Sequence, residues 1–561
     1  MSDSFFNTGS DLKDNFAKAK FYTDIQKSGV YPENSLDLPS SGVCFCGGGT
    51  RAMNCAIGQM SGLSELNLWD HIGYISAVSG GSWASTIFTY YQSGAENDTE
   101  LLGQIVKPKD LNRGNLNDQP AGFMGRVVSD SLEKSLILRL GKDVLTLGIL
   151  QKLHNIWIDA VGDTYLRKYG IYDQKNPKYF TLDKSTLDSI LERNPELKAS
   201  DFLLVHSKAG DAKRPFLIIN SSLQAPTSDL PIQKEENLSV FNYTPLYVGS
   251  AKYLEIDDEN VISGDKVNFG AGGGFIESFA FGSKDPQKDS DPDSLQVSLT
   301  DKRFEIVEAT GTSSAAYGST VGSFMLSGLP GYLLDKIPFS KLIPEASYWP
   351  YPGFKEIGKP QKYRFTDGGN LENLGFITLL QRKVERIVVF INTSTALALG
   401  CTFSPEEPPT SEEVSSDFYP LFGFTWGNQI HNQVFSKEDF NPVYQALAKA
   451  KEAGETVMTR SSLTTVANDW WGIPAGQKVE VLWVYNEQVS KWEDQLSDDL
   501  KEEIAKGKKG MFPYFPHYDL MFENGVTHGI SLTKEQVNLL YQLSAWNIYS
   551  NEVVFNDFLK R

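Results

Sequence analysis

The alternation of short apolar runs, glycine turns and helical patterns constrains the fold of this chain more than any other feature of its sequence. The run "GVCFCGGG", residues 42–49, predicts a buried strand that ends in three glycines, and "TRAMNCAIGQMSGL" then carries apolar residues at helical spacing. "HIGYISAV" and "SWASTIFTYYQ" repeat this order of strand and helix. Because strands that alternate with helices form parallel sheets, the sequence predicts an α/β fold with a central, mostly parallel sheet flanked by helices.

The remaining segments are predicted to build on this sheet. Residues 1–40 are expected to form a polar lead-in with short helical stretches, and residues 41–561 one large domain. Within that domain, residues 100–200 are predicted to be a helical insertion, either an ordinary packed one or a lid, and the Pro-, Ser- and Glu-rich residues 401–417 an exposed loop. The run "VEVLWVYN", residues 479–486, has a buried-strand pattern that could pair with the main sheet.

The charge of the chain excludes some partners. Asp and Glu outnumber Lys and Arg by 70 to 52, which gives a formal net charge of -18 at pH 7. Because such a surface repels phosphate backbones and no basic stripe carries interleaved aromatic residues, we expect no nucleic-acid partner and little attraction to strongly anionic membranes. The N-terminus lacks the pattern of a secretory signal, and no window reaches the roughly 18 apolar residues of a membrane span, so we expect a cytoplasmic protein.

Neither the cysteines nor the acidic runs form a recognisable metal site. Three of the four cysteines lie within positions 44–55, but further zinc ligands are missing nearby, so buried free thiols in a reducing compartment are the preferred interpretation. The run "DSDPDS", residues 289–294, mimics the start of a calcium loop. Ser294 stands where that loop needs glycine, and Thr300 stands where it needs glutamate. We therefore expect no metal and no cofactor.

The turn "AVSGGSW", residues 77–83, places a serine where a nucleophile can be exposed. Ser79 directly follows the predicted strand, so its hydroxyl can project above the end of the sheet, and two glycines then allow a tight start to the helix. Ser82 lies one turn farther in and is expected to cap or pack. The match to G-x-S-x-G is imperfect because Ala77 stands where the first glycine is expected, and a structural turn between two buried elements would look similar.

Two other glycine turns offer the groups that a serine nucleophile needs. In "CGGGTR", residues 46–51, successive glycines leave backbone N–H groups free to point at one small volume, which suits an oxyanion. A nucleotide phosphate is the rival ligand, but neither of the usual phosphate-loop patterns is present. Arg51 lies within reach of the same anion pocket or pairs with a carboxylate. In "YRFTDGGNLENLG", Asp367 ends an extended run, and we expect all three turns to meet at the carboxyl edge of the sheet.

The three turns together resemble a known family. "GGGTRAM", "VSGGSW" and "DGGNLENLG" occur in the order typical of the patatin-like and cytosolic phospholipase A2 superfamily, and "FNYTPLYVGS" resembles its cytosolic phospholipase A2 and fungal lysophospholipase (phospholipase B) branch. The resemblance covers residues 41–90, 241–252 and 363–395. It implies a patatin/cytosolic phospholipase A2-like α/β fold with a helical insertion.

The resemblance also implies an activity and a set of roles. The activity is a serine acyl hydrolase that cleaves fatty acyl esters of glycerophospholipids or lysophospholipids through an acyl-enzyme. Ser79 would be the nucleophile and Asp367 its partner in a dyad without histidine, while Gly48 and Gly49 would donate to the oxyanion and Arg51 would contact the substrate's phosphate. Two alternatives stay open: an esterase of the same mechanism for neutral lipids or small esters, and a catalytically silent lipid-binding or scaffold protein.

A phospholipid substrate implies peripheral contact with a membrane surface. Since about 40 residues precede the first motif, the sequence predicts no calcium-dependent lipid-docking module ahead of it. Residues 326–353, which are apolar, aromatic and rich in proline, are the candidate contact surface, with a buried connection as the alternative.

Overall fold

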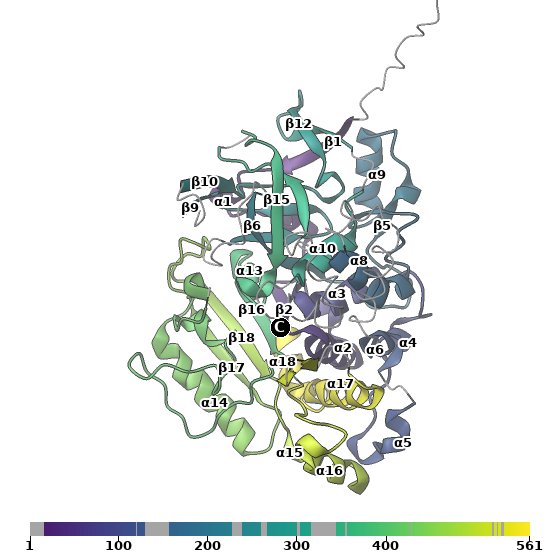
Figure 1. Cartoon of the computed structure of the whole chain (residues 1–561), viewed down its shortest axis with the longest axis vertical. Coiled ribbons are helices and arrows are strands. Elements are labelled where there is room, and N and C mark those ends of the chain that lie inside the picture. Colours follow the sequence, from purple (N-terminus) through teal and green to yellow (C-terminus); the bar gives the residue numbers. More distant parts are fainter. Residues whose placement is uncertain are drawn as a thin grey trace, which may run out of the picture.

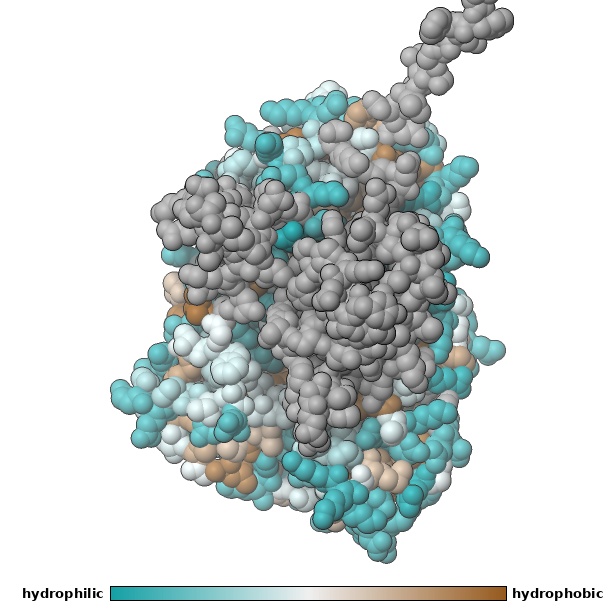
Figure 2. Space-filling model, viewed as in Figure 1, coloured by the Kyte–Doolittle hydropathy of each residue, from teal (hydrophilic) through white to brown (hydrophobic). Residues whose placement is uncertain are grey.

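The computed structural model of the protein contains one large mixed sheet with helices against its faces (Figure 1). On the face drawn in Figure 2, hydrophilic side chains dominate the described surface and hydrophobic ones are scattered among them. The structure describes residues 16–118, 121–129, 156–226, 238–259, 266–299, 303–315, 344–353, 356–427, 429–518, 521–523, 526–528 and 532–561.

Five parallel strands form the centre of the sheet. Their order across the sheet is β18 (Lys478–Tyr485), β16 (Arg386–Ile391), β2 (Ser41–Phe45), β3 (Tyr74–Val78) and β6 (Phe216–Pro226). Every residue of β2 and β3 is buried, as expected for parallel strands that are covered on both faces. The predicted α/β fold with a mostly parallel core is confirmed, and so is the predicted strand at residues 479–486.

Antiparallel strands extend this centre, which the sequence did not predict. They are β1 (Phe16–Tyr22), β7 (Ser239–Tyr243), β8 (Tyr247–Ser250), β11 (Gly274–Glu277), β12 (Lys284–Lys288), β13 (Ser294–Ser298), β14 (Glu345–Tyr348), β15 (Gln361–Asp367) and β17 (Met458–Thr464). Three separate pairs join β4 (Tyr179–Thr181) to β5 (Phe202–Leu204), β9 (Leu254–Glu259) to β10 (Lys266–Ala271), and β19 (Met521–Glu523) to β20 (Val526–His528).

Short helical turns do occur at Ile25–Ser28 and Pro32–Leu36, but strand β1 precedes them and was not predicted. Its sequence FAKAKFY alternates, so that Ala17, Ala19 and Phe21 are buried while the intervening side chains are more exposed. The strand pairs with β13 and β11 and so belongs to the main sheet. A period of two residues fits a strand better than a helix, and the lysines between the apolar positions hid that signal.

The described helices are mostly short. Their bounds are α1 (Ile25–Ser28), α2 (Gly49–Glu65), α3 (Ser79–Tyr90), α4 (Asp98–Leu102), α5 (Arg113–Leu116), α6 (Gly122–Val128), α8 (Ile156–Val161), α9 (Lys184–Arg193), α10 (Ile306–Ser313), α13 (Phe376–Gln381), α14 (Phe440–Glu452), α15 (Ser490–Glu493), α16 (Asp498–Ala505), α17 (Lys534–Tyr549) and α18 (Glu552–Leu559). Within the described ranges, none of them is both long and apolar enough to cross a membrane.

Different helices cover the two faces of the parallel centre (Figure 1). Val43 and Phe45 of β2 pack in a hydrophobic cluster with residues of α2, α3 and α17, whereas Cys44 and Cys46 pack in a second cluster with residues of α13 and α14. Helix α2 also packs closely on α17, where a Cβ atom on Gly58 would lie 2.5 Å from the carbonyl oxygen of Tyr541. The glycines of α2 therefore permit a helix contact that larger residues would prevent.

The remaining sequence predictions concern the cysteines, the loop 401–417, the helical insertion and the membrane-contact segment. The clustered cysteines are buried free thiols, as predicted. Residues 401–417 expose most of their middle part, although Phe403 and Val414 are buried. Residues 130–155 of the expected helical insertion, and residues 326–343 of the expected membrane-contact segment, lie outside the described residues.

Candidate active site

The three glycine turns meet at the carboxyl edge of the parallel centre. The N–H of Gly47, which follows β2, donates to the carbonyl oxygen of Asn373 at 3.0 Å. A Cβ atom on Gly80 would lie 2.1 Å from the carbonyl oxygen of Gly49, and one on Gly47 would lie 3.1 Å from the Cβ atom of Ser79. Segments that lie about thirty and three hundred residues apart in the sequence are thus in backbone contact, as strand ends at one sheet edge should be.

Ser79 occupies a strained turn between β3 and α3. Its φ angle is 48°, in the left-handed region that residues other than glycine seldom adopt, and its side chain hydroxyl donates to the Oδ2 atom of Asp367 at 3.0 Å. Ala77 causes none of this strain, because it lies inside β3 and pairs in register with Phe45 and Ile219. The departure from the G-x-S-x-G pattern therefore falls on a strand position that alanine can occupy.

The other serines of the turn have structural partners. The hydroxyl of Ser82 donates to the carbonyl oxygen of Ser79 at 2.6 Å, and that of Ser85 donates to Gly81 at 2.8 Å. Both bonds run back along α3, so these side chains brace the first turns of the helix. Ser79 differs from both in donating to a carboxylate.

Asp367 ends β15 and is buried beside Ser79. Its side chain is only 5% exposed, and its Oδ1 atom accepts a hydrogen bond from the N–H of Gly369 at 2.7 Å. Burial raises the pKa of Asp367 from its ordinary value of 3.8 to about 7, although the bonds from Gly369 and Ser79 oppose the rise. A carboxylate with a pKa near neutrality can take up and release a proton at physiological pH.

The glycine turn at the start of α2 has a backbone conformation that can bind an anion through N–H groups. Gly48 and Gly49 have φ angles of 132° and 59°, both in the left-handed region. They are the N-cap and the first residue of α2, where an α-helix leaves N–H groups without an intrahelical acceptor. The positive end of the helix dipole adds a favourable field for negative charge at this position.

Arg51 lies one turn farther along α2 and against the same glycines. A Cβ atom on Gly48 would lie 2.7 Å from its Nη2 atom. Its Nε atom donates to the carbonyl oxygen of Asn392 at 2.9 Å, and its Nη1 atom donates to that of Tyr518 at 2.6 Å. These bonds hold the guanidinium group in one position beside the turn.

A segment that no motif marked holds both members of the Ser79–Asp367 pair. The N–H of Ser79 donates to the Oγ atom of Ser313 at 3.0 Å, and this hydroxyl donates in turn to the carbonyl oxygen of Asn220 at 2.6 Å. Two residues after Ser313, the carbonyl oxygen of Ala315 accepts from the N–H of Asp367 at 3.0 Å. The end of α10 therefore bridges the backbones of the two residues, and in sequence it is only a run of small residues.

A second carboxylate also belongs to the site. Asp417 closes the segment predicted to be an exposed loop, yet it is partly buried and its Oδ2 atom accepts from the Nδ2 atom of Asn373 at 2.8 Å. Burial raises the pKa of Asp417, while the charge of Arg51 opposes the rise. The negative charge of Asp417 contributes in turn to the raised pKa of Asp367. The sequence offered no signal for this position.

One group of three side chains in the described ranges could in principle hold a metal ion, namely Asp98, His206 and Asp211. Arg214 pairs with both carboxylate oxygens of Asp98, at 2.5 and 2.8 Å, and the Oδ2 atom of Asp211 accepts from the Tyr91 hydroxyl at 2.8 Å while it faces His206 Nε2 at the same distance. A cation would have to displace an arginine, so the group fits an ion-pair cluster better than a metal centre.

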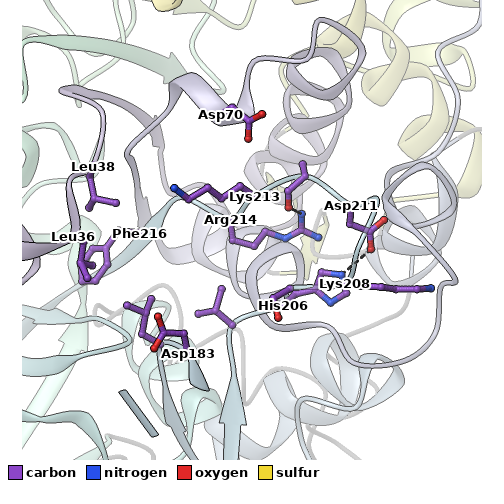
Figure 3. A pocket seen from close by; sticks show the side chains of 14 residues that line it. Leu36, Leu38, Asp70, Asp183, His206, Lys208, Asp211, Lys213, Arg214 and Phe216 are labelled. Carbon is purple, nitrogen blue, oxygen red and sulfur yellow. Dashed lines mark hydrogen bonds and ion pairs between the residues drawn. The ribbon is translucent and has the colours of Figure 1, made fainter. Parts of the chain in front are cut away.

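This cluster lies far from the site within the fold. Three of its side chains, His206, Asp211 and Arg214, line a cavity of about 560 Å³ together with Phe216, which begins β6 (Figure 3). Ser79 follows the end of β3, which runs parallel to β6. The cavity is therefore at the amino edge of the sheet and the candidate active site at the carboxyl edge.

The fold and this geometry define an α/β protein with a serine–carboxylate pair at a strand-to-helix turn. No family model matches the chain. Its sequence is 42% identical to human (Homo sapiens) cytosolic phospholipase A2 zeta over 74 residues, which are 13% of this chain and 8% of that protein. It is 26% identical to a phospholipase B of Cryptococcus neoformans var. grubii over 222 residues, or 38% of this chain and 30% of that protein. These matches confirm the resemblance to cytosolic phospholipases A2 and fungal phospholipases B.

The chain is also similar to solved structures. Human GIVD cytosolic phospholipase A2 aligns with 96% of this chain and 65% of its own, at 13% identity and a TM-score of 0.44. A complex of the same protein with a methyl gamma-linolenyl fluorophosphonate inhibitor and terbium chloride aligns with 96% of this chain and 62% of its own, at 13% identity and a TM-score of 0.43. The chain spans less than a third of the length of the two curated relatives named above.

Proposed function

We propose that this protein is a serine acyl hydrolase that cleaves fatty acyl esters of glycerophospholipids or lysophospholipids. The observation that carries the proposal is the 3.0 Å hydrogen bond from the strained Ser79 to the buried Asp367. The sequence relatives are named phospholipases, which supports a lipid ester as the substrate class. We further propose that the protein is cytoplasmic, with peripheral contact to a membrane.

The proposed reaction follows from the neighbours of the Ser79 hydroxyl. Asp367 accepts the hydroxyl proton as the Ser79 oxygen attacks the ester carbonyl carbon, and the N–H groups of Gly48 and Gly49 stabilise the resulting oxyanion. The carboxyl group then returns the proton to the departing lyso-lipid or glycerol oxygen. A water molecule attacks the acyl-enzyme by the same route in reverse, with Asp367 again as the base, and releases the fatty acid.

Arg51 is proposed to contact the phosphate of the substrate. The guanidinium group lies beside the proposed oxyanion turn, and its bonds to two backbone carbonyls fix its position. Because those bonds occupy Nε and Nη1, an esterase for neutral lipids or small esters is a second candidate function. The two candidates predict different effects of changing this residue.

The test compares a mixed-acyl phosphatidylcholine, its lyso derivative and a neutral diacylglycerol, with products identified by mass spectrometry. A phospholipase should release fatty acid from the first two. Arg51→Lys keeps the positive charge but loses the planar guanidinium group that can donate two parallel hydrogen bonds to a phosphate. It should reduce kcat/KM for the phospholipids by about tenfold relative to diacylglycerol. An equal loss on all three substrates would favour the neutral-ester candidate, and no release by the parent protein would favour a silent lipid-binding protein.

Ser313 is expected to act as a positioning residue for this reaction. Ser313→Ala removes the bonds to Ser79 and Asn220, so the turn should relax and kcat should fall about 10- to 100-fold with KM little changed. Ser313→Thr, which keeps the hydroxyl, should recover part of the loss. Ser314→Ala is the matched control, because the Ser314 hydroxyl donates, among the described residues, only to the carbonyl oxygens of Thr310 and Gly311 within α10. Equal effects of the two alanine variants would contradict this role.

A further inference from the structure

Two backbone carbonyls hold the guanidinium group of Arg51, and each belongs to a different segment. The Nε atom donates to the carbonyl oxygen of Asn392 at 2.9 Å, and the Nη1 atom donates to that of Tyr518 at 2.6 Å. Because the group is planar, two bonds from different nitrogen atoms fix both its position and its plane. The direction of the third nitrogen, Nη2, which lies against Gly48, therefore depends on where these two carbonyls stand.

Gln59 holds the first of these carbonyls through a reciprocal amide pair. Its Nε2 atom donates to the Oδ1 atom of Asn392 at 2.6 Å, and the Nδ2 atom of Asn392 donates back to the Oε1 atom of Gln59 at 3.1 Å. The backbone N–H of Asn392 also donates to the Sγ atom of Cys46 at 3.1 Å. Asn392 directly follows β16, so its N–H and its side chain are both fixed at this strand end.

Close packing alone does not explain an amide pair at this position. Both side chains are buried, and apolar side chains of the same size would join α2 to β16 without the cost of taking two amides out of water. A hydrogen-bonded polar pair specifies one geometry more strictly than apolar packing does. Helix α2 carries both Gln59 and Arg51, so it contacts Asn392 twice, once through the group that supports this residue and once through the group that the residue supports.

The second carbonyl is anchored without Gln59. The Nε2 atom of His517 lies 3.0 Å from the Oε1 atom of Glu487, a buried carboxylate. The Nδ2 atom of Asn486 donates to the carbonyl oxygen of Pro516 at 3.1 Å. Glu487 and Asn486 both follow β18, so the end of that strand holds the chain that leads to Tyr518. Loss of Gln59 should therefore tilt the guanidinium group about its Nη1 end.

We propose that Gln59 is a positioning residue for Arg51 and so sets the preference of the site for esters that carry a phosphate. Through Asn392 it holds the Nε end of the guanidinium group, which fixes the direction of Nη2 beside the proposed oxyanion turn. An arginine held in advance loses less conformational freedom when it binds a phosphate, and a misplacement of about 1 Å can cost up to about 10²-fold in rate. The inference rests on the proposed function, in which Arg51 contacts the phosphate of the substrate.

Gln59→Met tests this role, because methionine keeps the length of the side chain and removes both hydrogen bonds to Asn392. It should lower kcat/KM for a phosphatidylcholine about 3- to 10-fold and change that for diacylglycerol less than twofold. The loss should appear mainly in KM, because a contact with the phosphate exists in the ground state as well as in the transition state. Gln59→Glu, which can still accept from the Nδ2 atom of Asn392, should retain part of the preference. Equal losses on the two substrates would overturn the inference.

Asn54→Leu is the matched control on the same helix. Asn54 is also a buried amide, and its Nδ2 atom donates to the carbonyl oxygen of Val537 in α17 at 2.9 Å. Its replacement should lower the midpoint of chemical denaturation, as Gln59→Met should, and change the ratio of the two kcat/KM values less than twofold. If Asn54→Leu shifted that ratio as much as Gln59→Met, the effect would come from a disturbed α2 and the inference would be wrong.

A double-mutant cycle shows whether Gln59 acts through Arg51. In an Arg51→Met background, Gln59→Met should change the ratio of the two kcat/KM values less than twofold, since no guanidinium group remains to be positioned. A further selective loss on phosphatidylcholine in that background, of the size seen in the parent protein, would contradict the proposed role.

Crystal structures of the variants give a readout that does not depend on activity. The guanidinium group of Arg51 should be displaced, or divided between two positions, in Gln59→Met and unmoved in Asn54→Leu. An unmoved guanidinium group in Gln59→Met would refute this inference alone. Absence of fatty-acid release by the parent protein, from phosphatidylcholine and from diacylglycerol alike, would instead refute the proposed function.

Discussion

Ser79→Ala should lower the turnover of phospholipid by about 10³-fold or more, because no acyl-enzyme can form without the hydroxyl. The protein should stay folded, since alanine fills less space at the turn and the bond from the backbone N–H to Ser313 remains available. A fluorophosphonate probe should label the parent protein and leave this variant unlabelled. Mass spectrometry of the labelled peptide would locate the modification.

Ser82→Ala is the matched control for that experiment. Ser82 lies three residues away in the same helix, and its hydroxyl donates to the carbonyl oxygen of Ser79. Removing it should cost stability, by about 1 kcal/mol, and leave probe labelling in place. If Ser79→Ala retained full hydrolysis, or if Ser82→Ala alone abolished labelling, the assignment of the nucleophile would be wrong.

Asp367→Asn should lower kcat by about 10²–10⁴-fold, because the amide can still accept the Ser79 hydrogen bond but cannot take up its proton. In the parent protein, kcat/KM should rise with pH through about 7 as Asp367 becomes ionised. Rate measurements between pH 5 and 9 would test both expectations. A profile without that rise, or a variant with full activity, would exclude Asp367 as the base.

The same carboxyl group gives stability a defined dependence on pH. Its pKa is higher in the folded state than the ordinary value of 3.8, so the folded state binds the proton more tightly. The contribution of this group to stability is therefore present at low pH and is lost as pH rises through about 7. At pH 8, Asp367→Asn should raise the free energy of unfolding by at most about 4 kcal/mol, which chemical denaturation can measure.

Asp417→Asn tests whether the charge of Asp417 contributes to the pKa of Asp367 that shapes the pH–rate profile. The negative charge of Asp417 raises the pKa of Asp367, so removing that charge should move the acidic limb of the rate profile to lower pH. The amide can retain a hydrogen bond with Asn373, which keeps the geometry of the turn. A limb that moved to higher pH would show that the two carboxyl groups are not coupled in this way.

Local patterns in the sequence were sufficient to predict the parallel centre and the convergence of the three turns. Apolar runs such as "GYISAV" report burial on both faces, and glycines at their ends report close backbone contact. Strand β1 was missed because it alternates lysine with alanine, which weakens the apolar signal. Ser313 and Asp417 were missed because their importance comes from tertiary contacts, and a small or acidic residue before a loop has no distinctive spacing.

The bridge from the end of α10 to Ser79 and Asp367 has a consequence for how reactivity arises during folding. The strained serine depends on Ser313, which lies 234 residues farther along the chain, and the carboxylate depends on Ala315, so the pair is complete only after α3, the end of α10 and β15 have assembled. An unfinished chain would carry an ordinary serine in an unstrained turn and a solvated carboxylate of ordinary acidity. Nucleophilic character would then belong to the completed tertiary structure, which would spare the cell a reactive folding intermediate.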